Sequence, residues 1–295
     1  MDWITQTKIP VGRYAKAAFD WMQAHLGGLF DAVAAVLEAV IDAVLLVLQW
    51  PPDLAPLSPD YQPVYAPALH PLVIVALVVV LAWVLQRSWK VCLLVGLGFL
   101  FILNQGYWKA TTESLALILT AGILCMGLGV PLGIAAAHRP RLYRLMQPVL
   151  DLMQTLPTFV YLIPAIVFFG LGMVPGLVAT VIFVLPAPIR MTWLGISTTP
   201  PALAEAAEAF GATPMQKLWK VELPWARPQI MAGLNQTIML SLSMVVIAAL
   251  VGANGLGVPV VRALNSVNPA LGFESGAVIV VLAIVLDRLL RKARK

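Results

Sequence analysis

Long apolar runs, separated by short polar or basic segments, dominate the chain from about residue 68 to its C-terminal end. A helix needs about 20 apolar residues to cross the hydrocarbon core of a bilayer. Runs of about that length lie near 68–86, 91–108, 112–137, 148–170, 174–197, 228–252 and 271–288. The pattern predicts an all-α polytopic membrane protein with about seven transmembrane helices, and a transmembrane domain over residues 67–290.

The basic residues between these runs predict which side of the membrane each loop occupies. If the first span runs from outside to inside, all the basic groups in the following list are cytoplasmic, and the opposite loops near Asn104–Tyr107, Gly170–Pro175 and Ala253–Gly272 hold only Arg262. Cytoplasmic loops carry an excess of Lys and Arg, so the N-terminus is predicted outside and the C-terminus inside, with 291–295 as a basic cytoplasmic tail. The groups are Arg87, Lys90, His138, Arg139, Arg141, Arg144, Arg190, Lys217, Lys220, Arg227, Arg288, Arg291, Lys292, Arg294 and Lys295.

Residues 1–66 follow a different pattern. From Leu29 to Gln49 the chain is apolar, but Asp31, Glu38 and Asp42 recur with Gln49 at helical spacing and fall on one stripe. An acid near the bilayer centre costs about 2.5–3.5 kcal/mol on insertion scales. We therefore expect an amphipathic helix lying on the membrane surface. The alternative is a spanning helix whose acids pack inside the bundle.

Six prolines follow this segment and predict an extended connector, because proline interrupts helices. Further prolines inside the predicted spans should kink or interrupt them. Gly129 and Gly133 form a G-x-x-x-G pattern that would let two helices approach closely. The connector prolines are Pro51, Pro52, Pro56, Pro59, Pro63 and Pro67, and those within spans are Pro131, Pro157, Pro164, Pro186 and Pro188.

Composition narrows the function classes. The chain is 60% hydrophobic and 11% charged, with a mean hydropathy of +0.89, whereas soluble domains carry about 25% charged residues. No basic run is interleaved with aromatics, so a nucleic-acid role is excluded. Cys92 and Cys125 lie in apolar runs and are expected to be packing residues, without a metal site. No glycine precedes a lysine, so the chain lacks a phosphate-binding P-loop, and any ATP hydrolysis requires a partner.

The polar segment 199–224 is predicted to form two short cytoplasmic helices. Thr199 is a candidate N-cap followed by prolines suited to a first turn, and Gly211 stands where a helix C-cap favours a left-handed residue. Thr213 and Gln216 have capping-box spacing, and Leu223 with Pro224 is expected to stop the second helix. The first helix places Leu203, Ala206, Ala207 and Phe210 on an apolar face and Glu205 and Glu208 on a polar one. Composition alone also permits a linker helix without a partner.

The run Glu205-Ala206-Ala207, then Gly211 after three residues, then Val221-x-Leu223-Pro224 after nine more, resembles the EAA loop of permease subunits of binding-protein-dependent ABC importers. It departs from that family's pattern only in Val221, where the family has isoleucine. The resemblance implies that this loop docks on a separate ATPase. The residues it assigns to coupling are Glu205, Ala206, Ala207, Gly211, Leu223 and Pro224.

Three further stretches, 152–164, 233–248 and 282–288, are similar to glycine betaine, proline betaine and choline permeases, and the similarity extends roughly from residue 70 to 290. This resemblance implies the type I importer permease fold in a bacterial inner membrane. It also implies a permease homodimer, two ATPase subunits that bind ATP and magnesium, and an external substrate-binding protein. The chain itself is then a transporter subunit without catalytic residues or a cofactor of its own.

Aromatic faces hold quaternary ammonium groups, so aromatic residues within the spans are candidates for the substrate pathway. Packing or interfacial roles remain open for them, and the polar candidates could instead hydrogen-bond neighbouring helices. The aromatic candidates are Phe159, Tyr161, Phe168 and Trp193, and the polar ones are Asn235, Gln236, Ser241 and Ser243.

Other functions stay open at this stage. A channel or ATP-independent carrier usually buries ionisable groups for ion coupling, and the middles of these spans contain few. A membrane scaffold would show no flux. Within the importer class, the substrate could also be another compatible solute or an amino acid.

Overall fold

A computed structural model describes residues 10–49 and 69–290, and its regular elements there are all helical. The predicted proline-rich connector and the basic tail lie outside these residues. In chain order the helices are α2 (Val11–Leu48), α3 (Leu69–Gln86), α4 (Trp89–Asn104), α5 (Trp108–His138), α6 (Pro140–Thr155), α7 (Thr158–Phe169), α8 (Met173–Val184), α9 (Pro186–Ser197), α10 (Pro201–Ala209), α11 (Pro214–Lys217), the π-helical turn η1 (Leu218–Glu222), α12 (Leu223–Ala249), α13 (Gly257–Asn265) and α14 (Pro269–Leu290).

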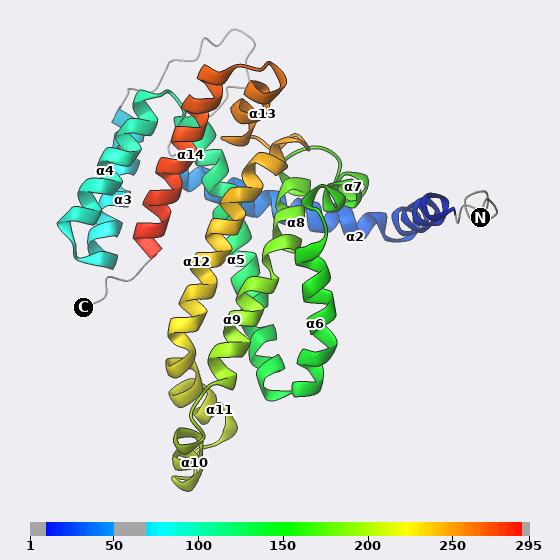
Figure 1. Cartoon of the computed structure of the whole chain (residues 1–295), viewed down its shortest axis with the longest axis vertical. Coiled ribbons are helices and arrows are strands. Elements are labelled where there is room, and N and C mark those ends of the chain that lie inside the picture. Colours follow the sequence, from blue (N-terminus) through cyan, green and yellow to red (C-terminus); the bar gives the residue numbers. More distant parts are fainter. Residues whose placement is uncertain (1–9, 50–68, 291–295) are drawn as a thin grey trace, which may run out of the picture.

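The bundle is built on α5, α12 and the pair α8–α9, which run side by side along the long axis (Figure 1). Glycines allow these helices to approach closely. A Cβ atom on Gly133 would lie 2.7 Å from the backbone oxygen of Ile189, and one on Gly129 would lie 2.7 Å from Cγ of Pro188. The predicted G-x-x-x-G contact is therefore confirmed as the seam between α5 and α9.

Four helical segments in the described part of the chain are long and apolar enough to cross a membrane: Trp108–His138, Met173–Ser197, Pro214–Ala249 and Pro269–Leu290. The pair α6–α7 could form a fifth span, and two shorter apolar helices cover Pro71–Gln86 and Trp89–Asn104. This set is broadly consistent with the prediction of about seven spans. Met173–Ser197 stays continuous across Pro186 because Leu185 keeps helical dihedrals and proline is tolerated in a first helical turn.

The apolar run predicted near 148–170 is interrupted, as its prolines led us to expect. Helix α6 begins earlier, at Pro140, and α6 and α7 meet at an angle of 96°. The break lies at Leu156, whose ψ of 138° is extended. Proline disfavours helical dihedrals in the residue before it, so Pro157 ends α6, as expected of a helix-interrupting proline. Pro164 and Pro131, in contrast, lie inside continuous helices.

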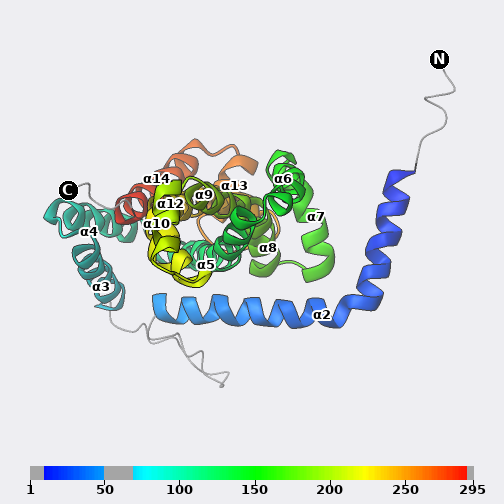
Figure 2. The ribbon, with the colours of Figure 1, turned by 90° about the horizontal axis from the view of Figure 1, so that it is seen from below.

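Helices α3, α4 and α14 form a second group beside α12 and the first part of α5 (Figures 1 and 2). Its core contains Val95, Phe99 and Ile102 of α4 packed with Leu282 and Val285 of α14. These positions recur at three- and four-residue steps, so each helix turns one apolar face inward.

Helix α2 lies across the bundle, roughly perpendicular to α5, α9 and α12 (Figure 1), and follows the side formed by α5, α7 and α8 (Figure 2). Ile41 is only 2% exposed and packs on Ala116 and Leu177, whereas Asp31 and Glu38 are exposed, as is Asp42. The spanning alternative requires these acids to pack inside the bundle, and in the structure they do not. The orientation supports the predicted surface helix.

Candidate functional site

Helix α10 and the turns after it form the end of the molecule farthest from α13 (Figure 1). No residue of α10 is buried. The apolar face predicted for it is open: Phe210 is 93% exposed, and Leu203 is also exposed. Further along, Met215 and Trp219 add exposed apolar surface. Since isolated exposed apolar groups are ordinary but contiguous ones mark interaction sites, this end of the chain has the character of a docking surface.

A Schellman motif ends α10 at Gly211. The backbone N–H of Ala212 donates to the carbonyl of Ala207 at 3.0 Å, and the N–H of Gly211 donates to Glu208 at 2.9 Å. Gly211 has φ of +76°, which only glycine adopts without strain. The predicted glycine C-cap is confirmed, and it turns the chain from α10 into the next helix.

Of the two N-caps predicted for α10 and α11, the structure contains one. The capping box of Thr213 and Gln216 is confirmed: the Gln216 N–H donates to the Thr213 hydroxyl, and the Thr213 N–H donates to the Gln216 side chain. The predicted N-cap at Thr199 is wrong, because Pro200 occupies that position. The Thr199 N–H still donates to Ile196 and so belongs to the end of α9.

The predicted helix stop at Leu223 and Pro224 is also wrong. Residues 214–249 form one continuous helical segment, in which the π-turn η1 joins α11 to α12. Proline in a helix normally clashes with the carbonyl four residues earlier. Here the Leu223 N–H donates five residues back to Leu218, which is the π pattern. The wider turn relieves the clash. Residues 199–224, which are predicted to couple the chain to an ATPase and are called the coupling segment below, therefore continue into α12 without a break.

Two polar contacts fix this segment. Lys217 donates to Glu208 over 2.7 Å, linking α11 to α10, and this hydrogen bond raises the pKa of Lys217. Glu222 is only 7% exposed and accepts from Nε2 of His138, the last residue of α5, at 2.8 Å. A buried carboxylate requires such a partner. Motion of η1 is therefore tied directly to the end of α5. Sequence reasoning missed both members of this pair because they lie 84 positions apart.

The six residues predicted for coupling lie between Glu205 and Pro224, along α10, α11, η1 and the start of α12. Glu205, Ala206, Gly211 and Pro224 are exposed, while Ala207 and Leu223 are half-buried. Exposed Glu205 and the small alanines leave room for another protein to seat against α10. Leu223 begins α12 directly after η1, so the predicted coupling set extends from the docking surface into the span.

The residues predicted for the substrate pathway differ in their surroundings. Tyr161 and Ser241 are buried and donate their hydroxyls to the carbonyls of Met153 and Thr237. Phe168 stacks on Phe30 of α2, with ring centroids 4.4 Å apart.

The other candidates differ in exposure. Phe159, Gln236 and Ser243 are exposed, and Asn235 donates to Asp287 at 3.4 Å, joining α12 to α14. Trp193 stacks face to face on Tyr143 with centroids 3.8 Å apart, so one of its faces is already covered.

The positive-inside pattern assigns Arg190 to a cytoplasmic loop, but in the structure Arg190 is not a loop residue. It lies in α9, seven residues before Ser197, and its Nη2 contacts Oδ1 of Asp151 on α6 at 2.6 Å. Asp151 lies eleven residues after the start of α6. At 1.5 Å per residue these positions are about 10 and 16 Å inside the two helices. Ionisable side chains within membrane spans are rare and usually functional, so this ion pair, which the sequence pattern did not indicate, is a functional candidate.

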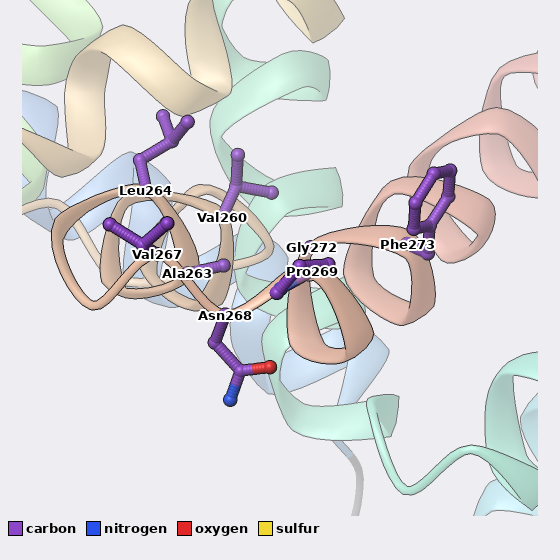
Figure 3. A pocket seen from close by; sticks show the side chains of 8 residues that line it. All are labelled: Val260, Ala263, Leu264, Val267, Asn268, Pro269, Gly272 and Phe273. Atoms are coloured by element: carbon purple, nitrogen blue, oxygen red, sulfur yellow. The ribbon is translucent and has the colours of Figure 1, made fainter.

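At the end opposite α10, α13 and α14 line an open, apolar surface pocket (Figure 3). Val260, Ala263 and Leu264 lie on α13, and Gly272 and Phe273 lie on α14. Its one amide side chain, Asn268, accepts from the N–H of Leu271 and caps α14. The pocket contains no charged lining group, so it offers little to orient a polar solute.

Comparison with known proteins gives consistent results. Residues 129–291 match the family model described as "Binding-protein-dependent transport system inner membrane component". The chain is 43% identical to the glycine betaine transport system permease protein OpuAB of Bacillus subtilis, over 96% of this chain and 93% of that protein. It is 40% identical to the glycine betaine/proline betaine permease ProW of Escherichia coli, over 98% of this chain and 76% of that protein.

A solved structure of the MetNI methionine ABC transporter in an inward-facing conformation resembles the fold, with a TM-score of 0.57 and 25% identity over 63% of this chain and 94% of that one. The matched family region includes the coupling segment and the spans on either side of it. The chain therefore belongs to the family of inner-membrane components of binding-protein-dependent transport systems and is a transporter subunit, not an enzyme.

Proposed function

We propose that this chain is the transmembrane permease subunit of an ATP-driven importer for quaternary-amine compatible solutes: glycine betaine, proline betaine or choline. The observation that carries the proposal is α10, an exposed helix with the EAA residues, a glycine C-cap and an uncovered apolar face. The substrate class rests on the names of relatives that align with nearly the whole chain.

The partners follow from this assignment. An ATPase subunit seats on α10, with Glu205, Ala206 and Ala207 at the contact, and that subunit binds ATP and magnesium. Two ATPases serve two permease copies paired as a homodimer, and an external binding protein delivers the solute. Closure of the ATPases draws the coupling segments together and switches the pathway between inward- and outward-facing states.

The continuous helix from α11 to α12 makes the coupling segment a lever. A separate short helix, as the sequence predicted, would transmit motion through a loop. Here a push on α10 reaches η1 through the Glu208–Lys217 contact, then α12 along the backbone and α5 through His138 and Glu222. The permease switch thereby involves the two central helices of the bundle.

In this proposal the N-terminus lies outside and the C-terminus inside the bacterial inner membrane. The turn between α3 and α4, the turn between α5 and α6, and the coupling segment lie toward the α10 end of the molecule (Figure 1). Basic residues are frequent in all three, and such loops are usually cytoplasmic.

The test is ATP-driven uptake of radiolabelled glycine betaine by proteoliposomes that contain the permease, its ATPase and its loaded binding protein. Glu205→Arg should reduce ATPase co-purification and uptake at least tenfold, because it places a cation at the centre of the proposed contact. Glu113→Gln is the control and should retain ATPase binding. Glu113 is distant from Glu205 in the sequence and lies near the start of α5, whereas the end of α5 at His138 contacts η1. Unchanged ATPase co-purification and uptake in Glu205→Arg would contradict the docking role of α10.

An amino-acid importer is the second candidate, since the structural match is to a methionine transporter. Competition decides between them: unlabelled proline betaine or choline should reduce betaine uptake, whereas methionine should not. A channel or ATP-independent carrier would move solute in vesicles that contain this chain alone. No flux is expected from such vesicles.

A further inference from the structure

The ion pair between Asp151 and Arg190 joins α6 to α9, two helices that belong to candidate membrane spans, and both of its side chains are partly open to the surroundings. The side chain of Asp151 is 52% exposed and that of Arg190 is 34% exposed. Nε of Arg190 is buried and has no hydrogen-bond partner. The pair therefore combines two opposite charges, one of them incompletely satisfied, on a surface that the described helices leave open.

Neighbouring residues on α6 continue this polar surface. Arg144, Gln147 and Asp151 are exposed at three- and four-residue steps, and Gln154 follows at the next step. Side chains at this spacing share one helix face. Ionisable side chains in membrane spans face a bundle interior or a water-filled cavity. This polar face of α6 is therefore a candidate lining for an aqueous route between candidate spans.

An aromatic contact also joins α6 to α9. Trp193 follows Arg190 by three residues on α9 and stacks on Tyr143 of α6. The two helices thus join twice, once through charges and once through parallel rings. An ammonium group is attracted to carboxylates and to the faces of aromatic rings, and a guanidinium binds carboxylates with paired, charge-assisted hydrogen bonds.

We propose that Asp151 and Arg190 form a solute contact in the translocation pathway that favours zwitterions with both a quaternary ammonium and a carboxylate. The inference rests on the proposed function and narrows its substrate class. The solute carboxylate binds Arg190, and its ammonium group approaches Asp151 and the neighbouring aromatic pair. In this structure the two side chains neutralise each other. Choline has no carboxylate and can satisfy only Asp151.

The experiment uses the complete complex of permease, ATPase and loaded binding protein in proteoliposomes, with uptake and ATP hydrolysis measured together. Arg190→Gln should lower glycine betaine uptake at least tenfold while ATP hydrolysis stimulated by the loaded binding protein stays within twofold of the wild type. The number of betaine molecules moved per ATP should fall accordingly. Asp151→Asn should act in the same direction. Arg141→Gln, which removes a cation at the start of α6, is the matched control and should leave the ratio unchanged.

A purely structural ion pair would behave differently. Complex assembly, ATP hydrolysis and uptake would then fall together in the single variants, and the exchange Asp151→Arg with Arg190→Asp would restore all three; that pattern would overturn the proposal. Unchanged betaine transport per ATP in both single variants would overturn it too. Failure of the wild-type complex to import betaine would instead refute the proposed function, so the two failures are distinguishable.

Discussion

At the residue scale, a few glycines determine how closely the central helices pack. Gly133 of α5 faces the backbone oxygen of Ile189 and Cβ of Thr192, and a Cβ atom added to it would lie 2.7 and 2.6 Å from them. Gly127 lies on the same helix and would meet nothing within 4 Å. The two positions therefore separate the effect of close packing from that of glycine in a helix.

Gly133→Ala should destabilise the permease by about 1–3 kcal/mol, because an inserted methyl forces the α5–α9 seam apart. Gly127→Ala should be neutral or stabilise by up to about 1 kcal/mol, since alanine favours helix interiors. Thermal unfolding of the purified protein in detergent measures both. Equal melting temperatures for the two variants would refute the role of the seam.

The same scale explains why Gly211 is glycine. Nothing lies within 4 Å of a Cβ added there, so space does not select the residue. Its positive φ does, and a left-handed residue with a side chain costs about 1–2 kcal/mol unless it is asparagine or aspartate. Gly211→Val should therefore weaken ATPase co-purification more than Gly211→Asn does. Equal binding by the two variants would show that the Schellman turn is not needed.

At the element scale, the contact between η1 and the end of α5 connects the coupling segment to the bundle. Glu222 is buried, and His138 is its hydrogen-bond partner. His138 also contacts the carbonyl of Ile134 through Nδ1, which holds the imidazole ring in place. The pair thus has a fixed geometry, unlike a flexible surface ion pair.

His138→Ala should cost about 1–3 kcal/mol, because it leaves the buried carboxylate of Glu222 unpaired. It should also reduce solute transported per ATP, since α5 no longer follows η1. Glu222→Gln retains an acceptor for Nε2 and should have a smaller effect. A double-mutant cycle on melting temperature and transport measures the coupling. Additive effects would exclude a direct link.

At the scale of the whole molecule, helix α4 offers a simple measure of orientation. Lys90 and Asn104 lie at its two ends and are both exposed. Cys92 and Cys125 are free thiols that make only weak contacts with backbone carbonyls of Val79 and Val181, so they can be replaced to give a cysteine-free background.

In that background, Asn104→Cys should react with a membrane-impermeant maleimide added to intact cells, and Lys90→Cys should react only in inside-out vesicles. The reason is that the positive-inside rule assigns the basic turn between α3 and α4 to the cytoplasm. Labelling of both variants after permeabilisation is the control. The reverse pattern would invert the proposed topology.

The sequence by itself determined the elements whose signal is local. Apolar runs identified most of the spans, because a helix in lipid must be apolar along its length. The exposed EAA helix and its glycine cap were likewise predicted, since capping depends on neighbouring residues. Spaced acids indicated the surface helix α2, and Pro157 indicated an interruption of the 148–170 run, although not its angle.

Only the tertiary structure shows the features that depend on residues distant in sequence or on an irregular backbone turn. It joined the coupling segment to α12 through the π-turn, where a proline alone predicted a stop. It paired Glu222 with His138 and Asp151 with Arg190, and it placed Arg190 within helix α9, although the charge pattern assigns it to a loop. Whether a charged residue can remain within a span depends on a partner from another helix, and the one-dimensional pattern does not record that partner.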